Sequence, residues 1–180
     1  AEDLLFNQKI PVDVASKKSS FVVTKSTDRS LMPQTVIGQG NTQITPLNNA
    51  LIMCAIANKG VIMKPYLADH IANYNGGTIK QYETSEYKKA LNEEEADAMK
   101  EMLKAVVTDG TGSALNTSAY TVAGKTGSAE YNSAKDSHAW FIGMSNVEDP
   151  DLIVSVIVEG GGSGGAAAAP EPAGTVSGPD

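Results

Sequence analysis

The stretch "VAGKTGSAEY", residues Val122 to Tyr131, poses the question of fold and function most sharply. It begins as a strand-like run and then presents a cation, a hydroxyl and a residue without a side chain. At a cleft, Lys125 and Thr126 can pair with a substrate carboxylate through charge-assisted hydrogen bonds. Gly127 lets an extended peptide approach the backbone closely, and the exposed strand edge can bind that peptide as an added strand. The stretch therefore predicts a piece of an active site.

Two further strands are predicted after this one. The segments "HAWFIGMS" (138–145) and "LIVSVIVE" (152–159) follow short polar connections. Such short links favour an antiparallel meander. The last segment is a continuous run rich in β-branched residues, as expected for a strand that is covered on both faces.

A buried helix is predicted in "ITPLNNALIMCAIANKG". Thr45 is a good N-cap, Pro46 suits the first helical position, and Gly60 is a natural stop. Apolar residues cover nearly every face up to Ala57, which is typical of a helix buried within a larger body. Cys54 lies inside this run, so we expect a buried structural thiol.

A second helix is predicted in "LNEEEADAMKEMLKAVVTDGTG". Asn92 caps it, Glu95 completes a capping box, and acidic residues fill the first turn, where the helix dipole favours them. We predict one apolar stripe at i, i+3, i+4 and i+7, made of Met99, Met102, Leu103 and Val106. Before this helix, two strand-like runs flank Asn75-Gly76-Gly77, which is a strong hairpin signal.

The two ends of the chain carry weaker patterns. Residues 1–43 are irregular, with short strands expected in "IPVDV" (10–14) and "FVVTK" (21–25). From Gly160 the composition changes to "GGGSGGAAAAPEPAGTVSGPD", with almost nothing to bury, and Pro170, Pro172 and Gly174 oppose a helix. We therefore expect a structured unit over residues 1–159 and a mobile tail over residues 160–180.

Composition excludes several classes of protein. The chain has 180 residues, 41% of them hydrophobic, which suits one globular domain. Its net charge of −7 and lack of a basic stripe argue against nucleic acid as a partner. His70 and His138 show no metal-ligand spacing. We read His138 as a structural residue and Trp140 as part of the core or of a cleft wall. No apolar run approaches the roughly 20 residues that span a bilayer.

Gly124-Lys125-Thr126 also invites comparison with a nucleotide-binding P-loop. That pattern requires a glycine at position 119, where this chain has Ala119. The residues between, Tyr120 to Val122, extend a strand rather than cradle a phosphate. A P-loop is therefore disfavoured.

Lys125-Thr126-Gly127 instead matches one motif of penicillin-binding proteins and class A β-lactamases, where K-T-G accompanies S-x-x-K and S-D-N. Its surroundings narrow the resemblance. The segments "IGQGNTQITPLNNALIMCAIANKGVIMKPYL", "MKEMLKAVVTDGTGSA", "SHAWFIGMS" and "VSVIVEGGGSGG" resemble, in order, those of class B penicillin-binding proteins, the monofunctional peptidoglycan transpeptidases. The resemblance covers roughly residues 5–169.

The resemblance implies a fold and a set of residue roles. The fold is α+β, an antiparallel sheet with packed helices, and residues 1–159 correspond to the C-terminal part of the transpeptidase domain. Lys125, Thr126, Gly127 and Ser128 bind substrate. Lys125 and the backbone N–H of Ser128 serve catalysis, the latter in the oxyanion hole. No cofactor or metal is implied.

The resemblance also shows what this chain does not contain. The nucleophile of the family is the serine of S-x-x-K, and the match Ser85-Glu86-Tyr87-Lys88 is a poor candidate. It precedes the Asn92 cap, on the outgoing strand of the predicted hairpin, where residues i and i+3 point to opposite faces. No S-x-N follows before Lys125. We therefore expect the nucleophile, its lysine and S-x-N upstream of residue 1, and this chain to be inactive alone.

The resulting hypothesis is a serine D,D-transpeptidase that crosslinks peptidoglycan stem peptides ending in D-Ala-D-Ala and is acylated by β-lactams. Its partners would include the N-terminal half of the same domain. It would lie outside the cytoplasmic membrane and be anchored by an N-terminal helix. Two alternatives stay open, a non-catalytic β-lactam-recognising sensor and a serine β-lactamase-like hydrolase.

The C-terminus departs from the family's pattern. The family usually has an apolar helix packed on its sheet at this point, but no apolar stripe follows Pro170 in this sequence.

Overall fold

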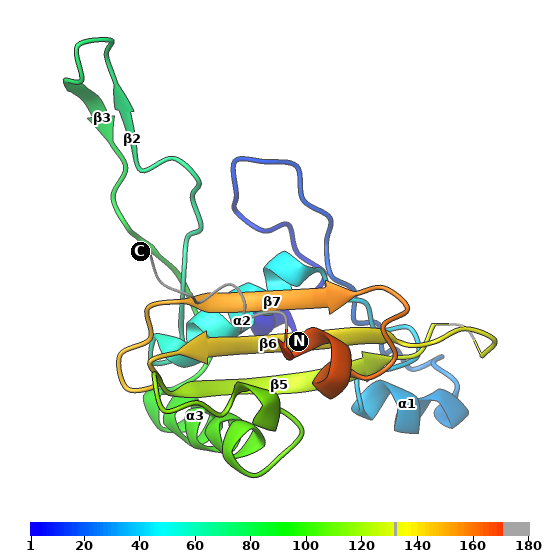
Figure 1. Cartoon of the computed structure of the whole chain (residues 1–180). Helices are drawn as coiled ribbons and strands as arrows, with labels where there is room; N and C mark the ends of the chain where they lie inside the picture. The colour runs from blue at the N-terminus through cyan, green and yellow to red at the C-terminus, as the bar shows by residue number, and fades with distance from the viewer. Residues whose placement is uncertain (132, 171–180) are drawn as a thin grey trace.

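The computed structural model describes residues 1–131 and 133–170, and a three-stranded antiparallel meander is its centre (Figure 1). The strands are β5 (Val122–Ala129), β6 (His138–Ser145) and β7 (Ile153–Val158), in the order β5-β6-β7. Helix α2 (Pro46–Ala57) lies behind the sheet, α3 (Glu93–Thr108) runs along β5, and the short helix η4 (Gly164–Ala168) lies in front. The predicted meander and the α+β class are confirmed.

Strand β7 differs from its prediction in burial. All six of its residues are half-buried, so neither face is fully covered. The strand is one edge of the sheet, and each of its faces is only partly covered by neighbouring elements. A continuous β-branched run is thus compatible with a half-covered edge strand.

Helix α2 forms as its sequence predicts. The Thr45 hydroxyl accepts the backbone N–H of Asn48 at 3.2 Å, and no residue from 47 to 57 is exposed. Met53 and Ile56 pack toward the sheet, while Leu51 and Ala55 pack against the N-terminal segment. The helix is therefore covered from two sides. Cys54 is only half-buried, and this burial raises the pKa of its thiol.

The N-terminal segment covers α2 without forming the two expected strands. It contains the short helices η1 (Glu2–Leu4), η2 (Arg29–Leu31) and α1 (Met32–Val36), and its ladder contact is the bridge from Ser20 to Gln43. Leu5 and Ile10 are each 1% exposed and join the α2 cluster. Of the two segments expected to form strands, 10–14 therefore contributes Ile10 to the core as a single side chain, whereas Val22 and Val23 of 21–25 are exposed.

Helix α3 begins with the predicted capping box between Asn92 and Glu95. Its buried face is rotated from the predicted stripe. Ala96, Leu103 and Val107 are buried, whereas Met102 is 57% exposed. The helix inserts Leu103 into the cluster on one side of β5 and Val107 into the cluster on the other. This pose turns Met102 toward solvent.

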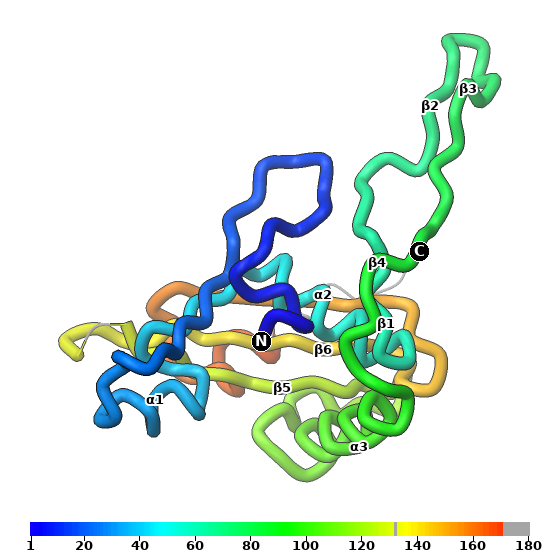
Figure 2. The backbone as a smooth tube through the Cα atoms, turned by 180° about the vertical axis from the view of Figure 1, so that it is seen from behind, coloured from blue at the N-terminus to red at the C-terminus, as the bar shows by residue number. Residues whose placement is uncertain are grey.

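Two small sheets form an arm that projects from the body (Figures 1 and 2). Strands β1 (Val61–Met63) and β4 (Glu86–Lys89) pair antiparallel, and β2 (His70–Ala72) pairs with β3 (Thr78–Gln81) beyond them. The predicted turn is confirmed. Gly76 has φ of 82°, and the Asn73 side chain accepts the backbone N–H groups of Asn75 and Gly77.

Residues 160–170 do not form the expected mobile tail. The N–H of Gly162 donates to the Ser137 carbonyl at 2.8 Å, and Ala168 and Ala169 are fully buried against Phe141. Leu115, in the short helix η3 (Ser113–Leu115), belongs to the apolar cluster on this side of the sheet. The small side chains of Ala168 and Ala169 close that cluster. Alanine fits there because it needs little room. The rest of the predicted tail, residues 171–180, lies outside the described residues.

Candidate active site

The site predicted from Lys-Thr-Gly lies along the outer edge of β5. A groove runs there between the second half of β5, residues 37–44 and the start of α2. Figure 2 shows the segment around α1 beside this end of the sheet. The groove is lined by Ile37, Gly38, Gln39, Ile44, Asn49, residues 125–129, Trp140 and Ile142. The structure thus brings all four predicted residues, 125–128, to the lining of one groove.

The hydrogen-bonding register fixes which backbone groups of β5 face this groove. The Asn146 N–H donates to the Thr121 carbonyl. In an antiparallel ladder such pairs recur at every second residue, so odd-numbered positions of β5 bond to β6. The N–H and C=O groups of Thr126 and Ser128 therefore point to the free edge. Ser128 can offer both groups to an added strand.

Lys125 and Thr126 lie on opposite faces of the sheet. Lys125 pairs with Ile142, which belongs to the cluster on the α2 side, and its side chain is exposed in the groove. Its ammonium donates to the Thr126 carbonyl at the strand edge. Thr126 pairs with Phe141 on the other face and is only 7% exposed. The alternation of a strand thus separates two side chains that the sequence pattern grouped together.

The Thr126 hydroxyl has a buried partner that the sequence pattern did not indicate. Its Oγ1 lies 2.5 Å from Oγ1 of Thr111, in the loop after α3. Such a contact fixes the rotamer of Thr126 and ties β5 to this loop. The only sequence signal was the "DGTG" stop of the helix.

Gly127 leaves room for a close approach to the backbone on the groove side of β5, as the motif predicts. A Cβ placed there would contact only the Cβ of Trp140, at 3.5 Å. Trp140 is half-buried and lines the groove, so it belongs to a cleft wall. The absence of a side chain at 127 leaves the strand edge open to a second chain.

Gly164 packs directly against the back of the motif. A Cβ at this position would lie 2.4 Å from the Gly127 carbonyl oxygen and 2.5 Å from that of Trp140. Its N–H also donates to the Ser128 hydroxyl at 3.3 Å. Gly164 therefore supports the motif from the face opposite Lys125. Sequence reasoning missed it because the glycine-rich run resembled a linker.

Gln39 is the other residue that sequence reasoning missed. Its amide nitrogen donates to the Ser128 carbonyl at 3.0 Å, across 89 residues of sequence. It lies in "IGQG", a segment that contributed to the family resemblance. Its contact with the strand edge depends on tertiary packing, which a local pattern does not reveal.

The alternative serine–lysine pair lies elsewhere. Lys88 is in β4, and its ammonium donates to the Glu2 carbonyl and to Asp3, each at 2.9 Å. The hydrogen bond and the charge of Lys88 hold the pKa of Asp3 below its ordinary value. The Ser85 carbonyl accepts the Lys64 N–H, next to the paired strands β1 and β4. Lys88 is therefore bound to the N-terminal segment.

The two histidines have structural contacts. His138 stacks on Tyr131 with ring centroids 3.9 Å apart, and its Nδ1 accepts the Gly160 N–H at 3.1 Å. His70 pairs with Asp69 on the exposed arm. Across residues 1–131 and 133–170, no group of three or more metal-ligating side chains comes together.

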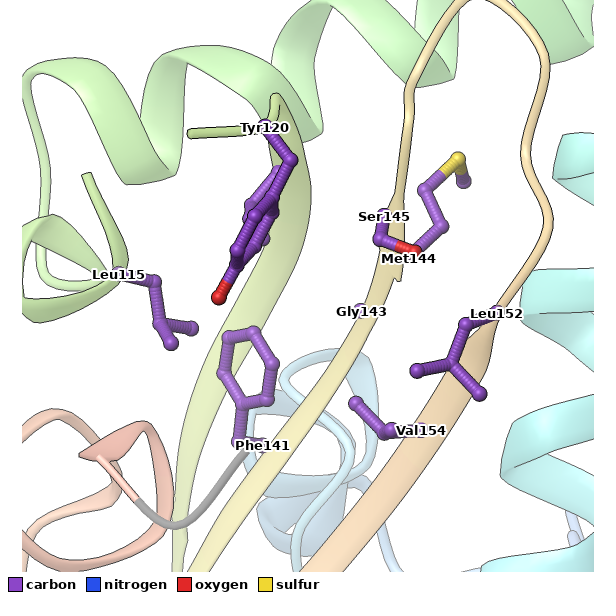
Figure 3. A pocket seen from close by; sticks show the side chains of 9 residues that line it. Leu115, Tyr120, Phe141, Gly143, Met144, Ser145, Leu152 and Val154 are labelled. Carbon is purple, nitrogen blue, oxygen red and sulfur yellow. The ribbon is translucent and has the colours of Figure 1, made fainter. Parts of the chain in front are cut away.

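A second hollow lies on the sheet face opposite Lys125 (Figure 3). Its walls are almost wholly apolar, and Tyr120, Phe141 and Leu115 close one side while Leu152 and Val154 close the other. It contains none of the predicted site residues.

The Lys-Thr-Gly motif is typical of penicillin-binding proteins and class A β-lactamases, and here it lies on the free edge of an antiparallel sheet. The family model for the penicillin-binding-protein transpeptidase domain matches residues 1–175. The chain belongs to this family.

Curated relatives support the same family. Peptidoglycan D,D-transpeptidase PbpA of Mycolicibacterium smegmatis is 31% identical over 157 residues, which cover 84% of this chain and 30% of that protein. Penicillin-binding protein 3 of Bacillus subtilis is 31% identical over 163 residues, which cover 86% of this chain and 23% of that protein. The chain thus spans less than a third of the length of each of these two relatives.

Solved structures share the fold. The imipenem acyl-enzyme of penicillin-binding protein A from M. tuberculosis superposes with a TM-score of 0.83 at 26% identity, over 96% of this chain and 39% of that one. The D,D-transpeptidase domain of a peptidoglycan glycosyltransferase from Eggerthella lenta gives a TM-score of 0.79 at 29% identity, over 98% and 46% of the respective chains. The predicted transpeptidase fold is confirmed.

Proposed function

We propose that this chain is the substrate-positioning part of a peptidoglycan D,D-transpeptidase. One observation carries the proposal: in a member of the transpeptidase family, the unpaired edge of Lys-Thr-Gly-Ser borders a groove that also holds an exposed lysine. Such an edge suits an extended peptide that ends in a carboxylate. The substrate would be a stem peptide ending in D-Ala-D-Ala.

Each residue of the motif has a proposed role. The Lys125 ammonium attracts the substrate carboxylate. The Ser128 N–H donates to the oxyanion that forms at the attacked carbonyl, a contact typically worth about 3 kcal/mol in the transition state. Gly127 allows close approach. Thr126 contributes its edge-facing backbone groups, and its hydroxyl, held by Thr111, fixes the strand.

The nucleophile is proposed to come from a segment upstream of residue 1. A serine needs a base to take its proton, and a lysine one helical turn away meets that need. Ser85 and Lys88 do not, because Lys88 lies in strand β4 rather than on a helix and is bound to Asp3. We propose that residues 1–170 are the C-terminal part of one transpeptidase domain and that the N-terminal part completes the site.

β-Lactams are proposed as ligands of the completed site. Neighbouring structures of penicillin-binding protein A from M. tuberculosis are described as imipenem and penicillin G acyl-enzyme complexes. A β-lactam offers a carboxylate and a strained amide carbonyl, which match Lys125 and the Ser128 N–H. No cofactor or metal enters this mechanism.

The proposed location is outside the cytoplasmic membrane, because peptidoglycan lies there. No helix among the described residues is long and apolar enough to cross a bilayer. We propose that an N-terminal anchor holds the intact protein at the cell surface.

Labelling with a fluorescent penicillin tests this proposal. The natural polypeptide at its full length should carry a covalent label on a denaturing gel, and the 180-residue chain alone should carry none. An unlabelled full-length protein would refute the proposed function. A label on the short chain that maps to Ser85 would overturn the proposed upstream nucleophile.

The lifetime of the label separates the alternatives. A transpeptidase retains the acyl group for long periods without an acceptor amine, whereas a β-lactamase-like hydrolase releases it within its turnover time. Labelling without crosslinking of stem peptides would indicate a sensor.

A further inference from the structure

The Gln39 side chain occupies the hydrogen-bonding position that an added strand needs on β5. The Ser128 C=O faces the free edge, as the register requires, and the Gln39 amide donates to it at 3.0 Å. A primary amide N–H on this carbonyl imitates the backbone N–H of a peptide. The groove thus contains an internal stand-in for part of its ligand.

The loop around Gln39 is shaped to present this side chain. Gly38 and Gly40 have φ of 76° and 70°, a region that side-chain-bearing residues rarely adopt. The Gln39 N–H is fixed to the Gln34 carbonyl at 2.8 Å. The backbone N–H of Gln39 is therefore anchored, while the half-buried side chain remains at the groove surface.

We propose that Gln39 is a specificity-determining residue that competes with the ligand amide for the Ser128 carbonyl. A ligand with a peptide-like N–H at this point must displace the Gln39 amide, while a ligand without such a group leaves the contact intact. Gln39 thus lowers the preference for acylamino ligands over those that bind only through their carboxylate and reactive carbonyl. This inference rests on the proposed function, since it assumes that ligands lie along β5.

Acylation by two β-lactams in the full-length protein tests the competition. Penicillin G carries an acylamino group, whereas imipenem carries a hydroxyethyl group at the corresponding ring position. Gln39→Met keeps the length of the side chain and removes its donor. We expect the second-order rate constant of acylation by penicillin G to rise about threefold to tenfold, the equivalent of one net hydrogen bond, and that by imipenem to stay within about twofold.

Gln81→Ala is the matched control, because Gln81 lies on the exposed arm and donates to Asp69 instead. It should change neither rate. A fall in the penicillin G rate of Gln39→Met would show that Gln39 binds the ligand, and equal changes for both ligands would show a general effect on the groove. Either result overturns the inference while the proposed function stands. Failure of the wild-type protein to react with either compound would instead refute the function.

Gln39→Ala is a second variant, which removes the donor and also shortens the side chain. Both variants should raise the ratio of the penicillin G rate to the imipenem rate. If only one of them does so, packing of the side chain rather than its hydrogen bond controls the ratio, and the inference is wrong. A thermal melt of each variant checks that the fold is retained.

Discussion

Strand β5 and the segment at β4 each carry a serine and a lysine three residues apart in sequence, with opposite outcomes. In β5, Lys125 and Ser128 border a groove. At β4, Ser85 precedes the strand and Lys88 is tied to Asp3 and Glu2. In any strand, residues i and i+3 project to opposite faces, so their side chains cannot act on each other. The shared spacing therefore has no chemical meaning in itself.

The difference lies in which groups each strand exposes. Lys125 contributes its side chain to the groove, and Ser128 contributes its backbone N–H and C=O to the same edge. A side chain and a peptide group can thus converge where two side chains cannot. At β4 the ammonium of Lys88 is instead held by Asp3 and by the Glu2 carbonyl. A motif on a strand must therefore be interpreted through the groups that its free edge exposes.

The largest expected effect is the difference in acylation rate between the variants that lack Lys125 and Lys88. Lys125→Ala removes the cation proposed for the ligand carboxylate, and we expect the rate of acylation of the full-length protein by penicillin G to fall roughly 30-fold or more. Lys88→Ala should leave it within about twofold. Stopped-flow or gel-based labelling measures both rates. Equal losses in the two variants would mean that β4 takes part in the reaction after all.

Substitutions of two glycines, one on each face of β5, should separate an effect on stability from an effect on ligand binding. In Gly164→Ala the new Cβ meets the backbone of Gly127 and Trp140, and we expect the free energy of unfolding to fall by about 1–3 kcal/mol. In Gly127→Ala the nearest atom is 3.5 Å away, so stability should change by less than about 1 kcal/mol. Its Cβ points into the groove, so acylation should slow.

Urea unfolding of each full-length variant measures its stability, and labelling of the folded variant with penicillin measures its rate of acylation. If Gly127→Ala were the more destabilising, the groove side of β5 would be tightly packed and unavailable to a substrate. If Gly164→Ala were as stable as wild type, η4 would be free to move away from the motif.

Local patterns were sufficient for the elements that depend on neighbours in sequence. The Thr45 and Asn92 caps, the Asn75-Gly76-Gly77 turn and the meander are each fixed by residues a few positions apart. The family resemblance supplied the fold. Lys125 in the groove followed from the motif, and the position of the Thr126 hydroxyl could have followed from strand alternation.

Contacts between segments that are distant in the sequence could not be predicted from local patterns. Gln39 reaches Ser128 across 89 residues, and Gly164 matters only because it touches the backbone of Gly127. The buried face of α3 was misplaced because the helix contacts both faces of β5, which no single stripe describes. Ala168 and Ala169 were expected in a tail, since small residues give a weak apolar signal even where they close a core.

The smallest expected effect concerns the pH dependence of the β4 ion pair. Lys88 lowers the pKa of Asp3 below 3.8, so the carboxylate stabilises the fold above pH 3.8 and loses this contribution as the pH falls through its lower folded pKa. Asp3→Asn should therefore lower Tm by roughly 1–2 °C at pH 6, and the difference from wild type should shrink toward pH 3. Asp13→Asn, at an exposed position, should leave Tm unchanged. A difference that grows as the pH falls would mean that Lys88 has another partner, which would reopen its assignment as a purely structural lysine.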